Sequence, residues 1–406
     1  MQNAENLIIG GGAAGLAAAC ALLQRGQTVT LLEKQSRVGR KLLATGNGRC
    51  NLTHMGASAR DYHGARGAAQ AALNRFPPEK VRAFFASLGV QCVEDGEGRV
   101  YPMSRQAASV LDALRLYLQE NGAEVITDCA AEDIRRGKRG FEVRAGEQIF
   151  FARRVLIATG GLAAPKLGAC GDGYRLLERL GHASTPRFPA IVALKTPPEQ
   201  VRGLKGQRVE CELALEIDGK IARVERGEAL FSESGVSGIA AMQLARECNA
   251  ALRAKKRCRA VIAILPDGGR EALQACANAL PERAMEDLLS GIVPKRVGMA
   301  LVKAAGIEPL NRPARTLTGA ERVRLGALLE RWPLDVTATE GFEQAQVTAG
   351  GVDLGAFDWN TLESKRVPGL YIAGELADVD GDCGGYNLQW AFASALTVAE
   401  AMSAAR

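Results

Sequence analysis

The sequence predicts an α/β fold, in which a parallel sheet covered by helices is interrupted by an inserted antiparallel β domain and a helical lobe. Three observations predict this arrangement. An apolar strand at 7–9 leads into a glycine-rich turn and an alanine-rich helix at 14–25. After Pro186 and Pro189 the pattern changes to alternating, strand-like residues, and at 369–374 the chain returns to a buried strand that ends in glycine.

The first turn, Gly10-Gly-Gly-Ala-Ala-Gly15, is typical of a Rossmann-like dinucleotide cradle. Gly10 permits the tight turn, Gly12 lets the backbone approach a pyrophosphate, and Gly15 lets the helix pack against the strand. The helix begins under the phosphates, so its unpaired N–H groups and its dipole face the anion. Glu33 ends the next strand, 28–32, about twenty residues downstream, where its carboxylate can accept hydrogen bonds from the adenosine ribose.

The composition is that of a globular protein and excludes several function classes. With 406 residues and 47% hydrophobic content, the chain can bury a large core in two or three domains. No segment approaches the ~20 continuous apolar residues of a membrane span and no basic, apolar leader precedes the first strand, so we expect a cytoplasmic location and no membrane partner. The net charge of +6 is small and the basic run 255–259 reads as a solvated helix end, so we expect no nucleic-acid partner.

The ten cysteines are scattered and contain no CxxC pair. This spacing argues against zinc, iron–sulfur clusters and a dithiol active site, so no metal site is expected.

Apolar periodicity assigns the remaining elements in chain order. The first part contains helices at 78–89 and 107–122, a strand at 123–127, a hairpin of 141–144 and 148–151, and a strand at 154–158. The middle part contains strands at 191–194 and 259–265, strand-like residues at 333–347, a hairpin within 207–224, a helix at 239–255 and mainly helical segments at 270–305 and 319–332. We therefore expect a dinucleotide-binding domain at 1–186 and 346–406, an inserted β-rich domain at 187–245 and 330–345, and a helical lobe at 246–329.

A second glycine turn near the C-terminus points to the same ligand. Gly374, Glu375 and Asp378 follow the carboxyl end of a strand, where open parallel sheets bind ligands, and an acid there suits a ribityl hydroxyl. Gly385 opens a helix at 388–403 with almost no charge, so we expect this helix to be buried and its N-terminus to face a ligand. The pyrimidine edge of an isoalloxazine gains negative charge on reduction and suits that position. The second turn therefore favours FAD over NAD.

The segment after the ribose acid is dense in glycine, amides and cations. Arg40 and Lys41 follow Gly39, and Thr45-Gly-Asn-Gly-Arg-Cys-Asn51 comes shortly after them. Such a segment allows close backbone contact, so we expect it to lie along the pyrophosphate and the flavin ring rather than to be an ordinary surface loop.

With these motifs the chain resembles a known family, the BaiN-type flavoproteins, which include bile-acid dehydrosteroid reductases and aminoacetone-oxidase-like enzymes. The segments 10–15, 39–43, 46–51 and 374–389 carry the resemblance. It implies FAD bound by a discontinuous domain into which a β-barrel-like domain and a helical lobe are inserted. One departure lies in the expected substrate region, where Phe231-Ser-Glu233 stands in place of the family's usual Phe-Thr-His.

The predicted cofactor site combines the two sources. The residue patterns predict FAD contacts for Gly10, Gly12, Gly15, Glu33, Arg40, Lys41, Thr45, Gly46, Asn47, Gly48, Cys50, Asn51, Gly374, Glu375, Asp378 and Gly385. The resemblance implies that Ala14, Ala131, Thr159, Gly160, Asn387 and Leu388 also line FAD, and we add their neighbours Ala13, Lys34, Gly161 and Gln389.

Three hypotheses describe the reaction. The first is a reductase that passes hydride from NADH or NADPH through FAD to an activated double bond of a small, enone- or steroid-like substrate. Since the sequence has no second Rossmann fingerprint, the nicotinamide would dock transiently over the flavin. The second is an oxidase of a small amine that uses oxygen, and the third is a flavin-binding regulatory protein without turnover. The sequence leaves the oligomeric state open.

Catalytic residues are predicted only as candidates, because the flavin carries the hydride chemistry and the protein needs to supply orientation and one proton donor. The candidates are Tyr386, Cys50, Cys383, His54 and Glu233. The alternative for Tyr386 and the two cysteines is that their side chains only pack in the protein interior and have no catalytic role. Glu233 would bind a cationic substrate or simply solvate a loop.

Overall fold

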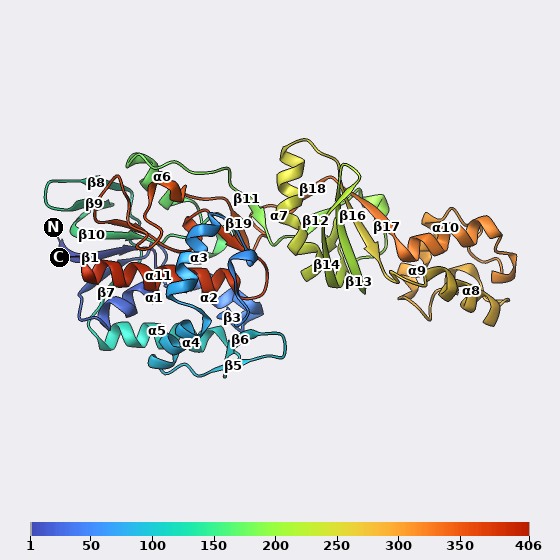
Figure 1. Cartoon of the computed structure of the whole chain (residues 1–406), viewed down its shortest axis with the longest axis horizontal. Coiled ribbons are helices and arrows are strands. Elements are labelled where there is room, and N and C mark those ends of the chain that lie inside the picture. Colours follow the sequence, from blue (N-terminus) through green and yellow to red (C-terminus); the bar gives the residue numbers. More distant parts are fainter. Residues whose placement is uncertain (1, 406) are drawn as a thin grey trace. The chain divides into compact units, whose positions relative to one another are not determined.

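The computed structural model describes residues 2–405, which form two compact units (Figure 1). One unit runs to Phe188 and resumes at Val347, and the other comprises Pro189–Gln346. The chain passes between the units twice, in strands β11 (Phe188–Ala190) and β19 (Val347–Ala349), which pair with each other. None of the helices within residues 2–405 is long and apolar enough to cross a bilayer.

The first unit is built on one sheet, with strand order β7-β2-β1-β10-β9-β8 and with β20 paired to β10. The parallel strands are β1 (Gln2–Ile9), β2 (Val29–Leu32), β7 (Glu124–Ile126), β10 (Gln148–Ile157) and β20 (Leu370–Ile372). The antiparallel strands are β8 (Asp133–Arg136) and β9 (Phe141–Ala145). The carboxyl ends of the parallel strands therefore meet at one edge, where the glycine turns follow β1, β10 and β20.

Strand β10 corrects the sequence prediction of two separate strands at 148–151 and 154–158. The structure has one continuous strand, because residues 148–152 pair antiparallel with β9 while residues 150–157 pair parallel with β1, so the two pairings overlap. The hairpin predicted around 145–146 is confirmed.

Helices α1 (Ala13–Leu23) and α11 (Tyr386–Ala404) lie side by side against this sheet, although they come from opposite ends of the chain (Figure 1). Every residue from Gln389 to Ala399 is buried, which confirms the prediction of a buried final helix. The helix begins at Tyr386, two residues before the predicted start. Further helices are α4 (Pro78–Ser87) and α5 (Ala107–Glu120), at the predicted positions.

The sequence analysis missed several short elements of the first unit. They are helices α2 (Arg40–Ala44), α3 (Arg66–Arg75) and α6 (Asp172–Arg179), and strands β3 (Thr53–His54), β4 (Tyr62–Gly64), β5 (Cys92–Glu94), β6 (Arg99–Pro102) and β21 (Val379–Gly381). The strands pair in small antiparallel sheets, β3 with β6 and β5 with β6, and β4 with β21.

The second unit is an antiparallel sheet with strand order β17-β16-β13-β14-β15-β12-β18. Its strands are β12 (Leu194–Lys195), β13 (Arg208–Ile217), β14 (Lys220–Phe231), β15 (Gly235–Ser237), β16 (Cys258–Ala263), β17 (Trp332–Val336) and β18 (Ala338–Thr339). The two end strands, β17 and β18, are separated in the chain by one residue, Thr337. The sheet must therefore curl until its edges approach each other, as in a barrel.

Helices complete the second unit. They are α7 (Ile239–Arg253), which packs on the sheet, and the lobe helices α8 (Gly269–Ala279), α9 (Lys295–Ala304) and α10 (Gly319–Glu330). The segment expected to be mainly helical at 270–305 contains two helices, α8 and α9, because Pro281 and Pro294 cannot continue a helix. One prediction needs correction here. The strand expected at 191–194 is interrupted because Ile191 has a φ of 50°, outside the β region.

Candidate active site

The first glycine turn leaves open space at one of its three key positions. A Cβ on Gly10 would lie 2.5 Å from the carbonyl oxygen of Ala158, and one on Gly15 would lie 1.9 Å from the carbonyl oxygen of Gly10. A Cβ on Gly12 would meet no protein atom within 4 Å. The protein itself therefore requires glycine at 10 and 15, whereas Gly12 faces a space that a pyrophosphate needs.

Glu33 is fixed beside this turn by two backbone donors. Its Oε2 accepts a hydrogen bond from the Gly11 N–H at 2.8 Å, and its Oε1 accepts one from the Gln35 N–H at 2.8 Å. Each carboxylate oxygen keeps a second lone pair for a ligand hydroxyl. The loop that contains Ala131 is tied to the same place, since the Cys129 N–H donates to the Glu33 carbonyl at 2.9 Å.

Lys34, by contrast, contacts a separate pair of side chains, Cys170 and Asp172. Its Nζ lies 2.8 Å from the Asp172 carboxylate and also contacts the Cys170 thiol. Burial lowers the pKa of Lys34, but the hydrogen bond and the charge of Asp172 outweigh it, so the pKa is raised. The ammonium group is thus held in an ion pair rather than left available for a phosphate.

The segment after Gly39 begins with helix α2 and continues in left-handed turns. Gly46 and Asn47 have φ values of 56° and 54°, and residues 46–49 are exposed. Arg40 contacts the Gln35 amide, and Lys41 pairs with Glu375 at 2.6 Å. The Lys41–Glu375 pair ties the segment to the C-terminal glycine turn, and the Gly39 N–H, which donates to the Gly11 carbonyl at 2.8 Å, ties it to the first turn.

The C-terminal glycine turn, which contains Gly374 and Glu375, is bonded to the final helix, α11. Gly374, with a φ of 74°, receives a hydrogen bond on its carbonyl from the Trp390 indole at 2.9 Å, and its N–H donates to the Ser394 hydroxyl at 3.0 Å. Glu375 accepts a hydrogen bond from the Thr348 N–H at 2.9 Å. The turn is therefore rigidly placed relative to the N-terminus of α11.

The side chains of two residues predicted to line the cofactor, Asn387 and Gln389, bond within the protein. The Asn387 side chain bonds the N–H and the carbonyl of Gly381, at 2.8 and 2.7 Å, and so shapes the turn before α11. Gln389 is fully buried, where its amide accepts from the Thr53 hydroxyl and donates to the Phe76 carbonyl. Their side chains are engaged, so the unpaired N–H groups of the first turn of α11 are the donors that remain for a ligand.

Two buried polar atoms at this site have no partner within the described part of the protein, and their chemistry suits FAD. Among residues 2–405, the side-chain oxygens Asn51 Oδ1 and Thr159 Oγ1 are buried and accept or donate no hydrogen bond. Asn51 Oδ1 lies 2.8 Å from where a Cβ on Gly385 would be, at the N-terminus of α11. An isoalloxazine offers an N–H donor between two carbonyl oxygens, which suits an acceptor beside helical N–H groups. When bound there, FAD supplies the hydride-transfer chemistry.

Two catalytic candidates are brought together at this end of α11. The rings of His54 and Tyr386 stack, with centroids 4.8 Å apart and planes at 20°. Burial raises the pKa of Tyr386 to about 12, so its hydroxyl keeps its proton at neutral pH. The Tyr62 hydroxyl donates to the Tyr386 carbonyl at 2.9 Å, which fixes this first helical residue.

The structure argues against three other candidates. Cys50 is fully buried, and burial raises the pKa of its thiol to about 12, so it packs as a neutral group. Burial raises the pKa of the Cys383 thiol as well. Glu233 belongs to the second unit, where its side chain is 74% exposed and pairs with Lys205 at 2.6 Å. Its surroundings are those of an exposed surface ion pair.

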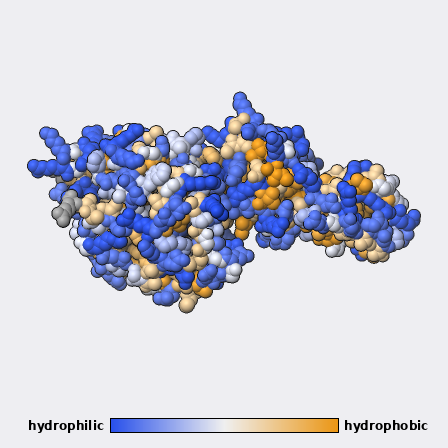
Figure 2. Space-filling model, viewed as in Figure 1, coloured by the Kyte–Doolittle hydropathy of each residue, from blue (hydrophilic) through white to orange (hydrophobic). Residues whose placement is uncertain are grey.

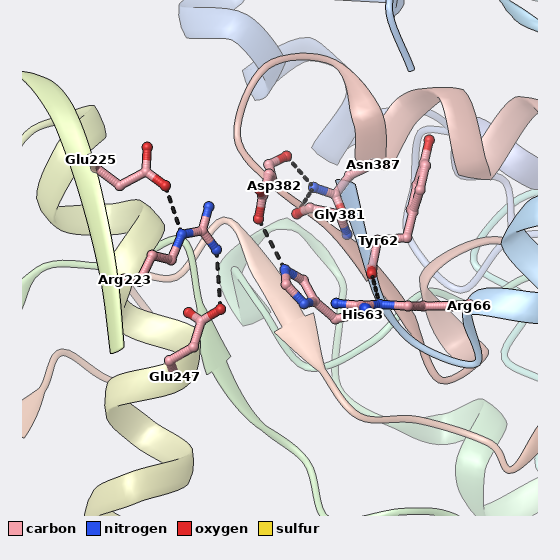
Figure 3. A network of polar contacts seen from close by, with 9 residues as sticks. All are labelled: Tyr62, His63, Arg66, Arg223, Glu225, Glu247, Gly381, Asp382 and Asn387. Atoms are coloured by element: carbon pink, nitrogen blue, oxygen red, sulfur yellow. Dashed lines mark hydrogen bonds and ion pairs between the residues drawn. The ribbon is translucent and has the colours of Figure 1, made fainter. Parts of the chain in front are cut away.

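The sequence analysis missed a histidine–carboxylate pair. The Nε2 of His63, on β4, lies 3.0 Å from the Oδ1 of Asp382, the residue that directly follows β21 (Figure 3). The two residues are 319 positions apart, so no local pattern could reveal the contact. Figure 3 also draws a pair of contacts of the second unit, in which Arg223 on β14 bonds Glu225 and Glu247.

Comparison with known proteins gives the family. The family described as "HI0933-like protein Rossmann domain" matches residues 4–401. The chain belongs to this family. A 3-dehydro-bile acid delta(4,6)-reductase from Clostridium scindens is 37% identical over 394 residues, which are 95% of this chain and 96% of the relative. The resemblance predicted from the glycine motifs is confirmed.

Two further proteins are similar to this chain, one in sequence and one in fold. A ribosomal RNA dihydrouridine synthase from Escherichia coli is 29% identical over the full length of both chains, 411 aligned residues. A solved 3-ketosteroid delta1-dehydrogenase from Sterolibacterium denitrificans superposes with a TM-score of 0.56 over 100% of both chains at 13% identity, which shows the fold alone. The chain is an FAD-dependent oxidoreductase, and the hypothesis of a flavin-binding protein without turnover is set aside.

Proposed function

We propose that this chain reduces a carbon–carbon double bond conjugated to a carbonyl group, with FAD as cofactor and NADH or NADPH as electron donor. The observation that carries the proposal is the 37% identity to a delta(4,6)-reductase of 3-dehydro-bile acids across 95% of this chain. The name of the other relative describes a related reaction, because dihydrouridine differs from uridine by two hydrogens on a double bond conjugated to a carbonyl.

In this proposal, two sets of residues in the first unit bind the two halves of FAD. The turn at 10–15 and Glu33 hold the adenosine half, and the turn at 374–378 and the N-terminus of α11 hold the flavin half. The α11 dipole and N–H groups stabilise negative charge on the pyrimidine edge and so favour reduction. Tyr386 and His54, at the same helix end, border the space that the substrate enters. We place the protein in the cytoplasm, where nicotinamide donors are available.

The choice of a steroid-like substrate rests on the bile-acid reductase relative. Figure 2 shows apolar side chains on the surface of the second unit. Its exposed apolar residues include Ile221 and Val224 on β14 and Ile239 at the start of α7, with exposed fractions of 57%, 43% and 50%. The first unit also exposes apolar residues, including Met103 and Leu116, and such single residues are ordinary, so the surface itself does not select the substrate.

A uridine in RNA is the second candidate substrate. The full-length match to the dihydrouridine synthase at 29% identity supports it. The small net charge of +6, from which no nucleic-acid partner is expected, speaks against it. The reaction chemistry is the same, and only the molecule that carries the double bond differs.

Product analysis tests the proposal. The FAD-loaded protein is incubated anaerobically with NADPH or NADH and, in parallel, a 3-oxo-4-ene steroid, an unmodified ribosomal RNA transcript or aminoacetone. We expect a steroid product that is two hydrogens heavier by mass spectrometry. Two added hydrogens in RNA nucleosides alone would select the second candidate. Flavin bleaching by aminoacetone but by neither nicotinamide would overturn the proposal in favour of an amine oxidase.

A further inference from the structure

The His63–Asp382 pair lies at the junction that forms the flavin half of the site. β4 and β21 pair antiparallel, with Tyr62 opposite Gly381 and His63 opposite Asp380. Asp382 follows β21, and four residues later Tyr386 begins α11. The Asp382 N–H donates to the Asp61 carbonyl at 2.9 Å, and its carbonyl accepts from Asn387 at 3.2 Å. Both backbone polar groups of Asp382 are therefore bonded, which fixes the position from which its carboxylate extends.

Neighbouring residues of β4 point to opposite faces, as in any strand. Tyr62 reaches the first turn of α11, through its hydroxyl on the Tyr386 carbonyl. His63 reaches Asp382 through Nε2. Arg66 is bonded to this strand, because its Nε donates to the Tyr62 carbonyl at 2.6 Å. The histidine ring thus has a fixed place beside the helix end where the flavin ring is proposed to lie (Figure 3).

The ring keeps one nitrogen for other chemistry. Within residues 2–405 the His63 ring makes one hydrogen bond, and Nδ1 takes no part in it. A carboxylate only accepts, so Nε2 is the ring nitrogen that donates to Asp382, and Nδ1 is the nitrogen left to face a ligand. The His63 side chain is 11% exposed, so the ring is largely buried but reaches the surface. This is the arrangement of an imidazole oriented by an acid for proton transfer.

We propose that His63, positioned by Asp382, is the proton donor of the reduction. The inference rests on the proposed function. As the double bond is reduced, its π bond breaks, the β carbon receives the hydride that the nicotinamide donor supplies through FAD, and the α carbon takes the proton from Nδ1 of doubly protonated His63. The neutral ring then takes a proton from solvent. Tyr386, whose hydroxyl holds its proton tightly, is left to border the substrate.

The first test separates proton transfer from hydride transfer. His63→Gln is loaded with FAD, reduced anaerobically by NADPH and mixed with a 3-oxo-4-ene steroid. We expect flavin reduction by NADPH at the wild-type rate, because that step needs no proton donor. We expect steroid reduction to fall by about 10²–10⁴-fold. Asp112→Asn, on an exposed face of α5, is the matched control and keeps wild-type rates.

The second test needs no hydride transfer. The wild-type protein should exchange the C4 hydrogens of a saturated 3-oxo steroid with D₂O, as measured by mass spectrometry, and His63→Gln should lose this exchange. Asp382→Asn should lose part of it and, in ¹⁵N spectra of histidine-labelled protein, should shift the His63 ring away from the Nε2–H tautomer. A merely structural role for the pair would lower thermal stability and leave the exchange in place.

The outcomes distinguish the two proposals. If His63→Gln does not fold, His63→Gly is used instead, and added imidazole should restore steroid reduction. If the wild type reduces the steroid and His63→Gln does so equally fast, or exchanges C4 equally fast, the assignment of His63 is wrong and the proposed function stands. If the wild type reduces no conjugated double bond, the proposed function fails first, and the assignment of His63 falls with it.

Discussion

At the scale of single residues, the glycines of the first turn differ in what surrounds them. Gly15 has a carbonyl oxygen where its side chain would be, and Gly12 has nothing within 4 Å. One glycine therefore serves the fold and the other serves the ligand, although both belong to one motif. Substitutions at these positions should separate folding from cofactor binding.

Gly12→Ala should leave the protein folded and remove its flavin. Gly12 has a φ of −84°, which alanine adopts without strain, and the new methyl group would occupy only the space expected for the pyrophosphate. Gly15→Ala is the contrasting variant, and the 1.9 Å clash with a backbone oxygen should destabilise the protein by several kcal/mol, more than the ~1–3 kcal/mol usual for overpacking. Thermal melts and flavin absorbance measure the two effects. Equal flavin content in Gly12→Ala and wild type would refute the cradle.

Glu33→Gln should weaken FAD binding by about 10–100-fold. The reason is the loss of charge-assisted hydrogen bonds, each worth about 1.5–3 kcal/mol, to the ribose hydroxyls. Titration of the apoprotein with FAD, followed by flavin fluorescence, gives the dissociation constant. Glu97→Gln, at a carboxylate that is 68% exposed, is the control and should bind FAD as the wild type does. An unchanged constant for Glu33→Gln would contradict the role given to this carboxylate.

At the scale of helices and strands, local patterns predicted the long elements and missed the long-range pairings. Helices α4, α5 and α7 and the hairpin β13–β14 each contain their own signal of periodicity or turn residues, so the sequence sufficed. The pairing of β4 with β21 joins three-residue strands from opposite ends of the chain and has no local signal. For the same reason the glycine turns of the site could be predicted, whereas His63 and Asp382 could not.

A buried histidine beyond α6 makes stability depend on pH. His182 is 3% exposed, its ring is tilted by 31° to that of Phe357 with the centroids 4.6 Å apart, and it shares a hydrogen bond of 3.1 Å with the Ser364 hydroxyl. Burial, together with the positive charge of Arg366, lowers the pKa of His182. The unfolded chain therefore binds this proton at a higher pH than the folded chain does. The resulting stability is complete above the ordinary histidine pKa of about 6.5 and is lost as the pH falls below it.

His182→Gln should flatten this dependence. Between pH 7.5 and 5, the free energy of unfolding of the wild type should fall with a contribution from His182 of at most about 1.4 kcal/mol per pH unit. Urea denaturation at each pH measures it, and the variant should lack that part of the slope. The same slope in both proteins would show that another group is responsible.

At the scale of the whole molecule, the chain leaves the first unit at Phe188 and re-enters it at Val347. The two crossing points are neighbours, because β11 pairs with β19 and the Gln346 N–H donates to the Ile191 carbonyl at 3.2 Å. The cofactor residues predicted from sequence all lie in the first unit. The second unit contributes no residue to the glycine turns, which suggests separate tasks for the two units.

Replacement of residues 192–345 by a short Gly-Ser linker should give a protein that still binds FAD but no longer reduces substrate. The linker needs to span only the gap between neighbouring strands, so its closure costs little. Flavin absorbance, circular dichroism and steroid reduction are the measurements. A folded deletion variant without flavin would show that the second unit is required for the cofactor, and full steroid reduction would show that it is not required for substrate.

The most direct test of the account is a sequential-mixing experiment on the FAD-loaded wild-type protein without oxygen. The first mixing adds NADPH or NADH, and the flavin absorbance in the visible should bleach. The second mixing adds a 3-oxo-4-ene steroid, and the absorbance should return as a product with two more hydrogens forms. A flavin that neither nicotinamide reduces, or one that stays reduced in the presence of the conjugated ketone and is reoxidised by oxygen alone, would contradict the account.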